Sequence, residues 1–211
     1  MKRLVLLEWR EISRDLRSWV VALFPVFLFN FSRTFAPADQ GAFFVLVDFG
    51  LIGLALEVAL VTDCVALPRT RGEFELLLLL PLSPARVLGA KLAAVLAPTF
   101  LLESFQILWV LLLHSAPASS GDVVRAGAFL FAVTLADAVW SARIALSGRT
   151  LRNISAKLVV WTIFLIGGFR IAIHLFPERF WSVVAALLAL SALGFRSLLG
   201  RWNRPERWLV Q

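Results

Sequence analysis

The chain has 211 residues, of which 60% are hydrophobic and only 17% charged, and its mean hydropathy is +0.84. Soluble domains are roughly half apolar and a quarter charged, so this composition excludes an ordinary water-soluble domain. The single cysteine, Cys64, excludes an intramolecular disulfide and a multi-cysteine metal site. The formal net charge of +7 is expected to report orientation in a membrane, and we predict no nucleic-acid partner.

The first 17 residues carry two stripes at helical spacing. Arginines 3, 10, 14 and 17 form one stripe, and the other, on roughly the opposite side, consists of Val5, Trp9, Ile12 and Leu16. This pattern predicts an interfacial helix over residues 1–17, lying flat on the inner leaflet. A simple topology anchor and a specific docking role explain the helix equally well.

Six apolar blocks follow, each near the ~20 residues that a helix needs to cross a bilayer. They fall at about 18–36, 42–65, 90–113, 125–146, 157–176 and 180–199. We therefore predict an all-α polytopic membrane protein with six transmembrane helices, in which residues 1–211 form one transmembrane domain.

The basic residues predict the orientation of these spans. With the N-terminus in the cytoplasm, 17 of the 21 lysines and arginines fall in inner segments. Only Arg33, Arg125 and Arg179 fall outside, and Arg170 lies near the outer end of span five. The positive-inside rule therefore predicts a multi-pass protein of the cell (inner) membrane with both termini cytoplasmic.

Between spans two and three lies the segment GEFELLLLLPLSPARVLGAK, residues 72–91. Thr70 is a good N-cap and Glu73 can complete a capping box, which predicts a short helix over residues 70–80. Pro81 ends this helix after about 14 Å, which is too short to cross a membrane.

A second helix start follows at Ser83 and Pro84. The helix that begins there is expected to run to Leu113, about 45 Å, whereas a hydrocarbon core is only ~30 Å thick. Its first turns, with Arg86 and Lys91, are therefore expected in the cytoplasm or among headgroups. By pattern alone, two interpretations of the short helix before it are open. It is either an interfacial loop helix without a partner or a helix that transmits the movement of a cytosolic partner to the transmembrane helix that follows.

This segment resembles the first cytoplasmic loop of permease subunits of ATP-binding-cassette exporters of the ABC-two class. That loop typically reads glycine, a small residue, an apolar residue, glutamate and two leucines, then proline, serine and a lysine. The residues that match in order are Gly72, Phe74, Glu75, Leu76, Leu77, Pro81, Ser83 and Lys91. Two features depart from the pattern: Glu73 replaces the usual small polar residue, and LPRTR replaces the usual charged run.

The resemblance implies that residues 70–80 form a coupling helix that docks on an ATPase. The implied ATPase-coupling residues are Gly72, Glu73, Phe74, Glu75, Leu76, Leu77 and Pro81. It also implies three partners: a separate ATP-binding-cassette ATPase subunit, a second permease chain that is identical or related, and the lipid membrane. The chain would not itself be an enzyme and would hold no cofactor, since ATP and Mg would be bound by the partner ATPase.

The chain lacks a phosphate-binding G-x-x-x-x-G-K-[ST] loop, because GAKL at residues 89–92 has neither the leading glycine nor the hydroxyl. Two histidines, His114 and His174, show no metal-ligand spacing, so no metal site is predicted. Three other functions stay open: the membrane subunit of a haem or cytochrome-maturation exporter, a secondary transporter that uses intramembrane carboxylates, and a scaffold that transports nothing.

Four ionisable residues within the spans are candidates for a path or gate: Glu57, Glu103, Asp137 and Arg170. A charge at mid-membrane costs on the order of 3 kcal/mol on insertion scales, so these side chains should avoid lipid. Span four places Thr134 and Ser141 on the same face as Asp137, and span three has Gln106 one turn after Glu103. The alternative is interhelical adhesion, through a carboxylate paired with Arg170 or a neutral acid bonded to a hydroxyl.

Span five contains Gly167 and Gly168, and Pro177 follows it. Paired glycines weaken a helix and proline ends one. The segment resembles the short re-entrant helices that ABC-two permeases have at the outer face. A plain turn at Pro177 and Glu178 is the alternative.

Overall fold

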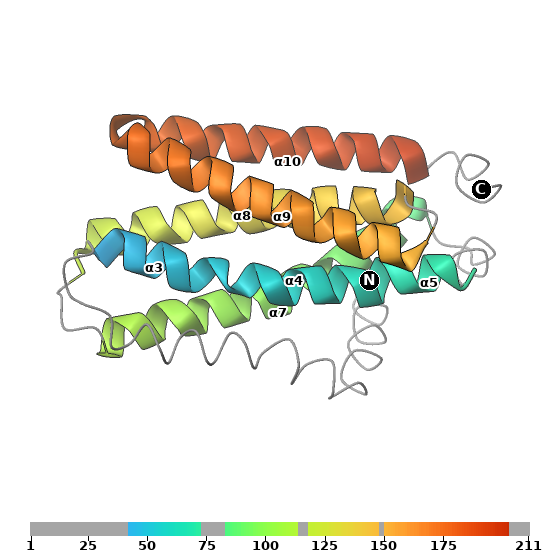
Figure 1. Ribbon diagram of the computed structural model, residues 1–211, viewed down its shortest axis with the longest axis horizontal. Helices are drawn as coiled ribbons and strands as arrows, with labels where there is room; N and C mark the ends of the chain where they lie inside the picture. The colour runs from blue at the N-terminus through green and yellow to red at the C-terminus, as the bar shows by residue number, and fades with distance from the viewer. Residues whose placement is uncertain (1–41, 73–82, 114–117, 148–149, 203–211) are drawn as a thin grey trace.

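The computed structural model describes residues 42–72, 83–113, 118–147 and 150–202, and every regular element in these ranges is helical (Figure 1). Five of the helical runs are long and apolar enough to cross a membrane. The all-α, membrane-compatible fold is therefore confirmed for the described part of the chain. The predicted interfacial helix 1–17 and first span 18–36 lie outside the described residues.

The first described run comprises α3 (Ala42–Leu51), α4 (Gly53–Val61), a π-helical segment η1 (Thr62–Ala66) and α5 (Leu67–Thr70). Only Ile52 separates α3 from α4, and its backbone is still helical, with φ −64° and ψ −27°. The run is 29 residues long, about 43 Å at 1.5 Å per residue. It starts where the predicted span 42–65 starts but extends one turn further.

The remaining elements are α7 (Pro84–Leu113), α8 (Ser120–Ser147), α9 (Leu151–Leu175), a 3-10 turn η2 (Pro177–Arg179) and α10 (Phe180–Trp202). Helix α7 has the predicted ends, because the Ser83 carbonyl accepts the first helical N–H, from Val87, and proline occupies the first position. Ser119 caps α8: its hydroxyl accepts from the Asp122 N–H at 3.1 Å, while its own N–H donates to the Asp122 carboxylate at 3.2 Å.

Successive long helices run in opposite directions, and α8 lies among the others (Figure 1). Helix α8 packs against α3, α4, α7, α9 and α10. One end of the bundle, here called the Pro84 end, contains the ends of α5, α8 and α10 and the starts of α7 and α9. The opposite end is called the Ala42 end.

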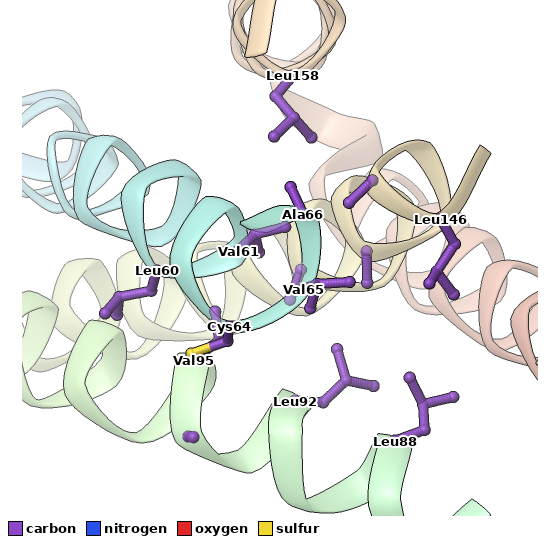
Figure 2. Close-up of a cluster of buried hydrophobic side chains, with 14 of the residues drawn as sticks. Leu60, Val61, Cys64, Val65, Ala66, Leu88, Leu92, Val95, Leu146 and Leu158 are labelled. Atoms are coloured by element: carbon purple, nitrogen blue, oxygen red, sulfur yellow. The ribbon is translucent and has the colours of Figure 1, made fainter. Parts of the chain in front are cut away.

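Buried apolar side chains form two clusters along the bundle. The first lies toward the Pro84 end and brings together side chains from α4, η1, α7, α8 and α9, among them Cys64, Leu88, Leu146 and Leu158 (Figure 2). Cys64 is thus a small packing residue, as its place in an apolar span indicates. The second cluster lies toward the Ala42 end and includes Leu46, Phe129 and Phe180.

The structure corrects the predicted start of the coupling helix. Thr70 is the last residue of α5 and not an N-cap; its hydroxyl donates to the Leu67 carbonyl at 3.0 Å. The chain then turns through Arg71 and Gly72, and Gly72 has φ +75°, a left-handed conformation that glycine adopts at little cost at the end of a helix. Residues 73–80 of the predicted helix, and Pro81, lie outside the described residues.

The expected re-entrant segment is also wrong. Helix α9 continues through Gly167 and Gly168 to Leu175, and only Phe176 and the turn Pro177–Arg179 connect it to α10. Glycine keeps the backbone N–H and C=O groups that form helical hydrogen bonds, and in an apolar environment those bonds have no water to compete with. The plain turn is the alternative that the structure contains.

The outward faces of α7, α9 and α10 are apolar. Their exposed side chains include Leu101, Phe105, Leu112, Ile163, Phe164, Trp181 and Leu193. An apolar surface of this extent is unfavourable in water. It is the surface expected of helices that face lipid or another membrane chain.

Candidate functional site

A layer of buried polar side chains separates the two apolar clusters. Glu57 of α4, Glu103 of α7 and Asp137 of α8 belong to it, together with Thr134 of α8 and Thr162 of α9, and all five side chains are buried. In α9 the layer falls between Leu158 of the first cluster and Leu165 of the second. The sequence candidates Glu57, Glu103 and Asp137 are therefore neighbours in the fold.

This layer lies near the middle of the helices. Glu57 is 15 residues from the start and 13 residues from the end of the run Ala42–Thr70, which places it about 20 Å from either end. Thr162 is similarly central in α9 (Leu151–Leu175). If the helices cross a bilayer, the acids lie at the depth where charge is most costly.

Glu103 has one hydroxyl partner. The Thr134 hydroxyl of α8 donates to the Glu103 Oε1 atom of α7, and both side chains are buried. This bond joins α7 to α8 in the interior of the bundle.

Asp137 has two hydroxyl partners. Thr162 Oγ1, from α9, lies 3.1 Å from both carboxylate oxygens, and Ser141 Oγ, one turn further along α8, lies 3.4 Å from Oδ1. The carboxylate of Asp137 thus connects α8 to α9. For Asp137 and Glu103 the structure contains the hydroxyl contacts of the adhesion alternative.

Glu57 differs from both. It is 0% exposed, and neither of its carboxylate oxygens has a hydrogen-bond partner within the described part of the chain. Asp137 and Glu103 lie close enough that, when ionised, they would repel an ionised Glu57. Gln106 of α7 is also buried, and neither its amide oxygen nor its amide nitrogen has a partner there.

Gly53 allows α4 to approach α7 at this level. A Cβ atom at Gly53 would lie 2.9 Å from Glu103 Cγ, 3.5 Å from Glu103 Oε1 and 3.7 Å from Gln106 Oε1. Glu57 follows Gly53 by one helical turn and so shares its face of α4. The side chains of Glu103 and Gln106 are therefore directed at the face of α4 that carries Glu57.

The geometry limits the chemistry available at this layer. The three carboxyl groups and the hydroxyl groups of Thr134, Ser141 and Thr162 can bind and transfer protons, or they can coordinate a small cation. The described residues include no group of three or more His, Cys, Asp or Glu side chains arranged to hold a metal ion. Three ionised carboxylates without a paired cation would be very costly in a dry interior, because isolated charges lose tens of kcal/mol of hydration in an apolar medium.

Arg170, the fourth path or gate candidate, lies in α9 eight residues beyond Thr162, about 12 Å along the helix axis. Its side chain is outside the described residues. None of Glu57, Glu103 and Asp137 forms an ion pair with a described residue. The predicted pairing of a carboxylate with Arg170 therefore stays a prediction.

Thr162 and Gly53 are site residues that the sequence analysis did not identify. Thr162 is the polar member of an otherwise apolar buried stripe on α9 that includes Ile154, Leu158 and Leu165. A single threonine in an apolar stripe at helical spacing could therefore have identified Thr162 from the sequence. No comparable signal marks Gly53, because its role depends on which helix approaches it.

The predicted ATPase-coupling segment has both of its flanks attached to the bundle. Before it, an Arg69 guanidinium nitrogen donates to the Ala145 carbonyl of α8 at 3.1 Å. After it, Lys91 Nζ donates to the Cys64 carbonyl in η1 at 2.8 Å. Among the predicted coupling residues Gly72 is described and exposed, whereas Glu73, Phe74, Glu75, Leu76, Leu77 and Pro81 lie outside the described residues.

The Lys91 contact corrects the expected position of its side chain. Arg86 is exposed, as predicted, but Lys91 is only 3% exposed. The residue four positions after Cys64 is Pro68, which has no N–H, so the Cys64 carbonyl has no α-helical donor. The buried ammonium group therefore finds an acceptor inside the protein rather than among headgroups.

Comparisons with known protein families, with curated proteins and with solved structures found no match to this chain.

Proposed function

We propose that the chain is the membrane permease subunit of an ATP-driven exporter, with the ATPase on a separate chain. The observation that carries the proposal is the segment between α5 and α7. Gly72 to Lys91 corresponds in order to the coupling loop of ABC-two permeases, and it connects two elements at the Pro84 end of the bundle. The chain performs no covalent chemistry in this role; it converts closure of the ATPase pair into movement of helices.

The attached flanks supply a route for that movement. Arg69 connects the near flank to α8 at Ala145, and Lys91 connects the far flank to η1 at Cys64. From Pro84 the helix α7 then continues for 30 residues and carries Glu103 about two thirds of the way along it. A push on the loop would thus reach the three helices that hold the buried acids.

The distribution of basic residues supports the orientation that this role requires. Those at or near the Pro84 end of the described helices are Arg69, Arg71, Arg86, Lys91, Arg143, Arg152, Lys157, Arg196 and Arg201, whereas Arg125, Arg170 and Arg179 lie at or near the Ala42 end. The positive-inside rule then puts the Pro84 end in the cytoplasm, where an ATPase would dock.

The apolar outward faces of α7, α9 and α10 support a second permease chain and surrounding lipid as neighbours. Two such chains, identical or related, would enclose the substrate path. In this proposal the buried acids of each chain are part of the path or its gate.

The proposal is tested with the full-length chain purified in lipid nanodiscs from its native membrane. Glu75→Lys reverses a charge in the proposed docking helix, and Leu77→Pro breaks that helix, while both spare every described helix. Wild-type protein should retain a copurifying ATP hydrolysis activity that is lost with either variant. The matched control is Glu178→Lys, the same charge reversal at an exposed position of η2 at the opposite end of the bundle. The proposal is contradicted if the wild-type protein and all three variants copurify with the same ATPase activity. It is also contradicted if none of the four copurifies with any.

The buried acids favour a second candidate function, a secondary transporter driven by a proton gradient. In pumps and transporters, carboxyl groups within the membrane commonly form proton relays. In sealed vesicles the two functions separate cleanly: a secondary transporter moves substrate when only a pH gradient is imposed, whereas the exporter needs ATP and its ATPase.

A further inference from the structure

We infer that Glu57, Glu103 and Asp137 form a buried proton-binding site. Glu57 holds a proton while α4, α7 and α8 are packed as in this structure and releases it when water enters between them. The inference stands on the polar layer alone and goes beyond the proposed ATP-driven export.

The first support is the environment of Glu57. Its carboxyl group is fully buried and lacks a hydrogen-bond donor within the described part of the chain. Its acidic neighbours Asp137 and Glu103 would, when ionised, repel an ionised Glu57. An ionised carboxylate in this buried position would have neither a donor nor a counter-ion among the described residues, so the neutral acid is the form that this packing accommodates.

The second support is Gln106, which is not an acid. Its amide is 1% exposed, and neither amide atom has a described partner. The Gly53 contact shows that its Oε1 atom is directed at the α4 face that carries Glu57. Such unsatisfied buried groups are rare in folded proteins, and they are often associated with a functional role.

The other charged groups on the surrounding helices lie away from this layer. On the same helical run, Asp48 is nine residues before Glu57 and Asp63 six residues after it, about 13 and 9 Å along the axis. The cations nearest in sequence have other contacts: Lys91 binds the Cys64 carbonyl, and the Arg143 guanidinium lies 4.4 Å from the Trp140 ring.

The remaining basic groups on α9 and α10 do not supply a counter-ion for Glu57 within the described part of the chain. Arg152, Lys157 and His174 of α9 and Arg196 of α10 are exposed, and the side chain of Arg201, near the end of α10, is outside the described residues. Arg170 lies eight residues beyond Thr162 on α9, with its side chain outside the described residues. The hydroxyl donors of the layer serve Asp137 and Glu103, not Glu57.

A proton fits these observations better than a metal ion. A cation such as Na⁺ or Ca²⁺ needs several oxygen ligands around one point. The described acids are not arranged around such a point, and Asp137 and Glu103 already direct oxygens at hydroxyls on neighbouring helices. A proton needs only one oxygen and removes one negative charge from the group.

The same geometry explains how the proton would leave. Gly53 brings α4 into contact with Glu103 and Gln106, so separation of α4 from α7 would admit water at Glu57. Hydration stabilises the ionised carboxylate, and the proton is released. Any movement that opens this contact, whether ATP drives it or not, would thereby be linked to proton release.

The test is infrared spectroscopy of the full-length chain in lipid vesicles at neutral pH, because the C=O stretch of a protonated carboxylic acid is separate from carboxylate bands. Wild-type protein should show a carboxylic acid component that shifts in D₂O and is lost in Glu57→Gln. Glu178→Gln, at the exposed turn η2, should leave it unchanged. The readout needs neither an ATPase nor a substrate, so it separates this inference from the proposed function.

Two results would overturn the inference. One is the absence of the carboxylic acid component from the wild-type spectrum at neutral pH. This result would count against the inference whether or not Glu57→Gln folds. The other is a wild-type component that disappears on addition of Na⁺ at constant pH, which would assign the site to a metal cation. If Glu57→Gln does not insert, Glu57→Asp retains the acid, and its component should persist at a shifted frequency; an unshifted component would assign the band to another carboxyl group.

Discussion

The contact between Thr162 and Asp137 leads to a prediction with a defined magnitude. Thr162→Val is nearly isosteric and removes one hydroxyl, so Asp137 loses both 3.1 Å contacts to Thr162 and keeps the Ser141 contact at 3.4 Å. Leaving a buried polar group without its partner costs about 1–3 kcal/mol. For a chain of this size 1 kcal/mol corresponds to roughly 2–4 °C in Tm, so the expected loss is about 2–12 °C.

Thr99→Val is the matched control. Thr99 is also a buried helical threonine, but its hydroxyl donates only to the Val95 carbonyl of its own helix, at 2.9 Å. That carbonyl keeps its backbone donor when the hydroxyl is lost, so we expect a Tm change of less than about 2 °C. Thr162→Ser retains the hydroxyl and should recover part of the loss.

Thermal unfolding in detergent, followed by circular dichroism and by light scattering, measures these differences. In an Asp137→Asn background the effect of Thr162→Val should shrink, because the two substitutions act on one contact. Equal Tm losses for Thr162→Val and Thr99→Val, together with additivity in the Asp137→Asn background, would refute the reasoning.

Two further predictions concern packing and orientation. A Cβ atom at Gly194 would lie 2.7 Å from Nε1 of Trp140, whose indole donates to the Leu190 carbonyl, so Gly194→Ala should destabilise the α8–α10 contact by about 1–3 kcal/mol in thermal unfolding. Gly127→Ala, where a Cβ would meet nothing within 4 Å, should be neutral or stabilising by up to ~1 kcal/mol, and the reverse order would contradict the packing argument. Cysteines introduced at the exposed Ser119 and Ser147 should react with a membrane-impermeant thiol reagent from outside and from inside respectively; the opposite pattern would invert the proposed orientation.

The sequence by itself determined the fold class and much of the helix plan. Apolar blocks of spanning length predict helices because every backbone polar group in a bilayer must be paired within its own segment. Local signals also predicted the helix from Pro84 to Leu113, since serine and proline at its start act within one turn. At Thr70 the same kind of local signal failed: the π-helical segment η1 and α5 carry the preceding run through this residue, and Gly72 then ends it.

The candidate site was predictable only as a set of separate residues. The cost of a charge in a membrane identified Glu57, Glu103 and Asp137, because that cost depends on each residue alone. Their proximity, the hydroxyl partners of two of them and the isolation of Glu57 depend on how α4, α7, α8 and α9 pack, and no local pattern encodes that packing. The buried Lys91 and the close approach at Gly53 were likewise decided by the tertiary structure, because each depends on which backbone or side chain of another helix lies opposite.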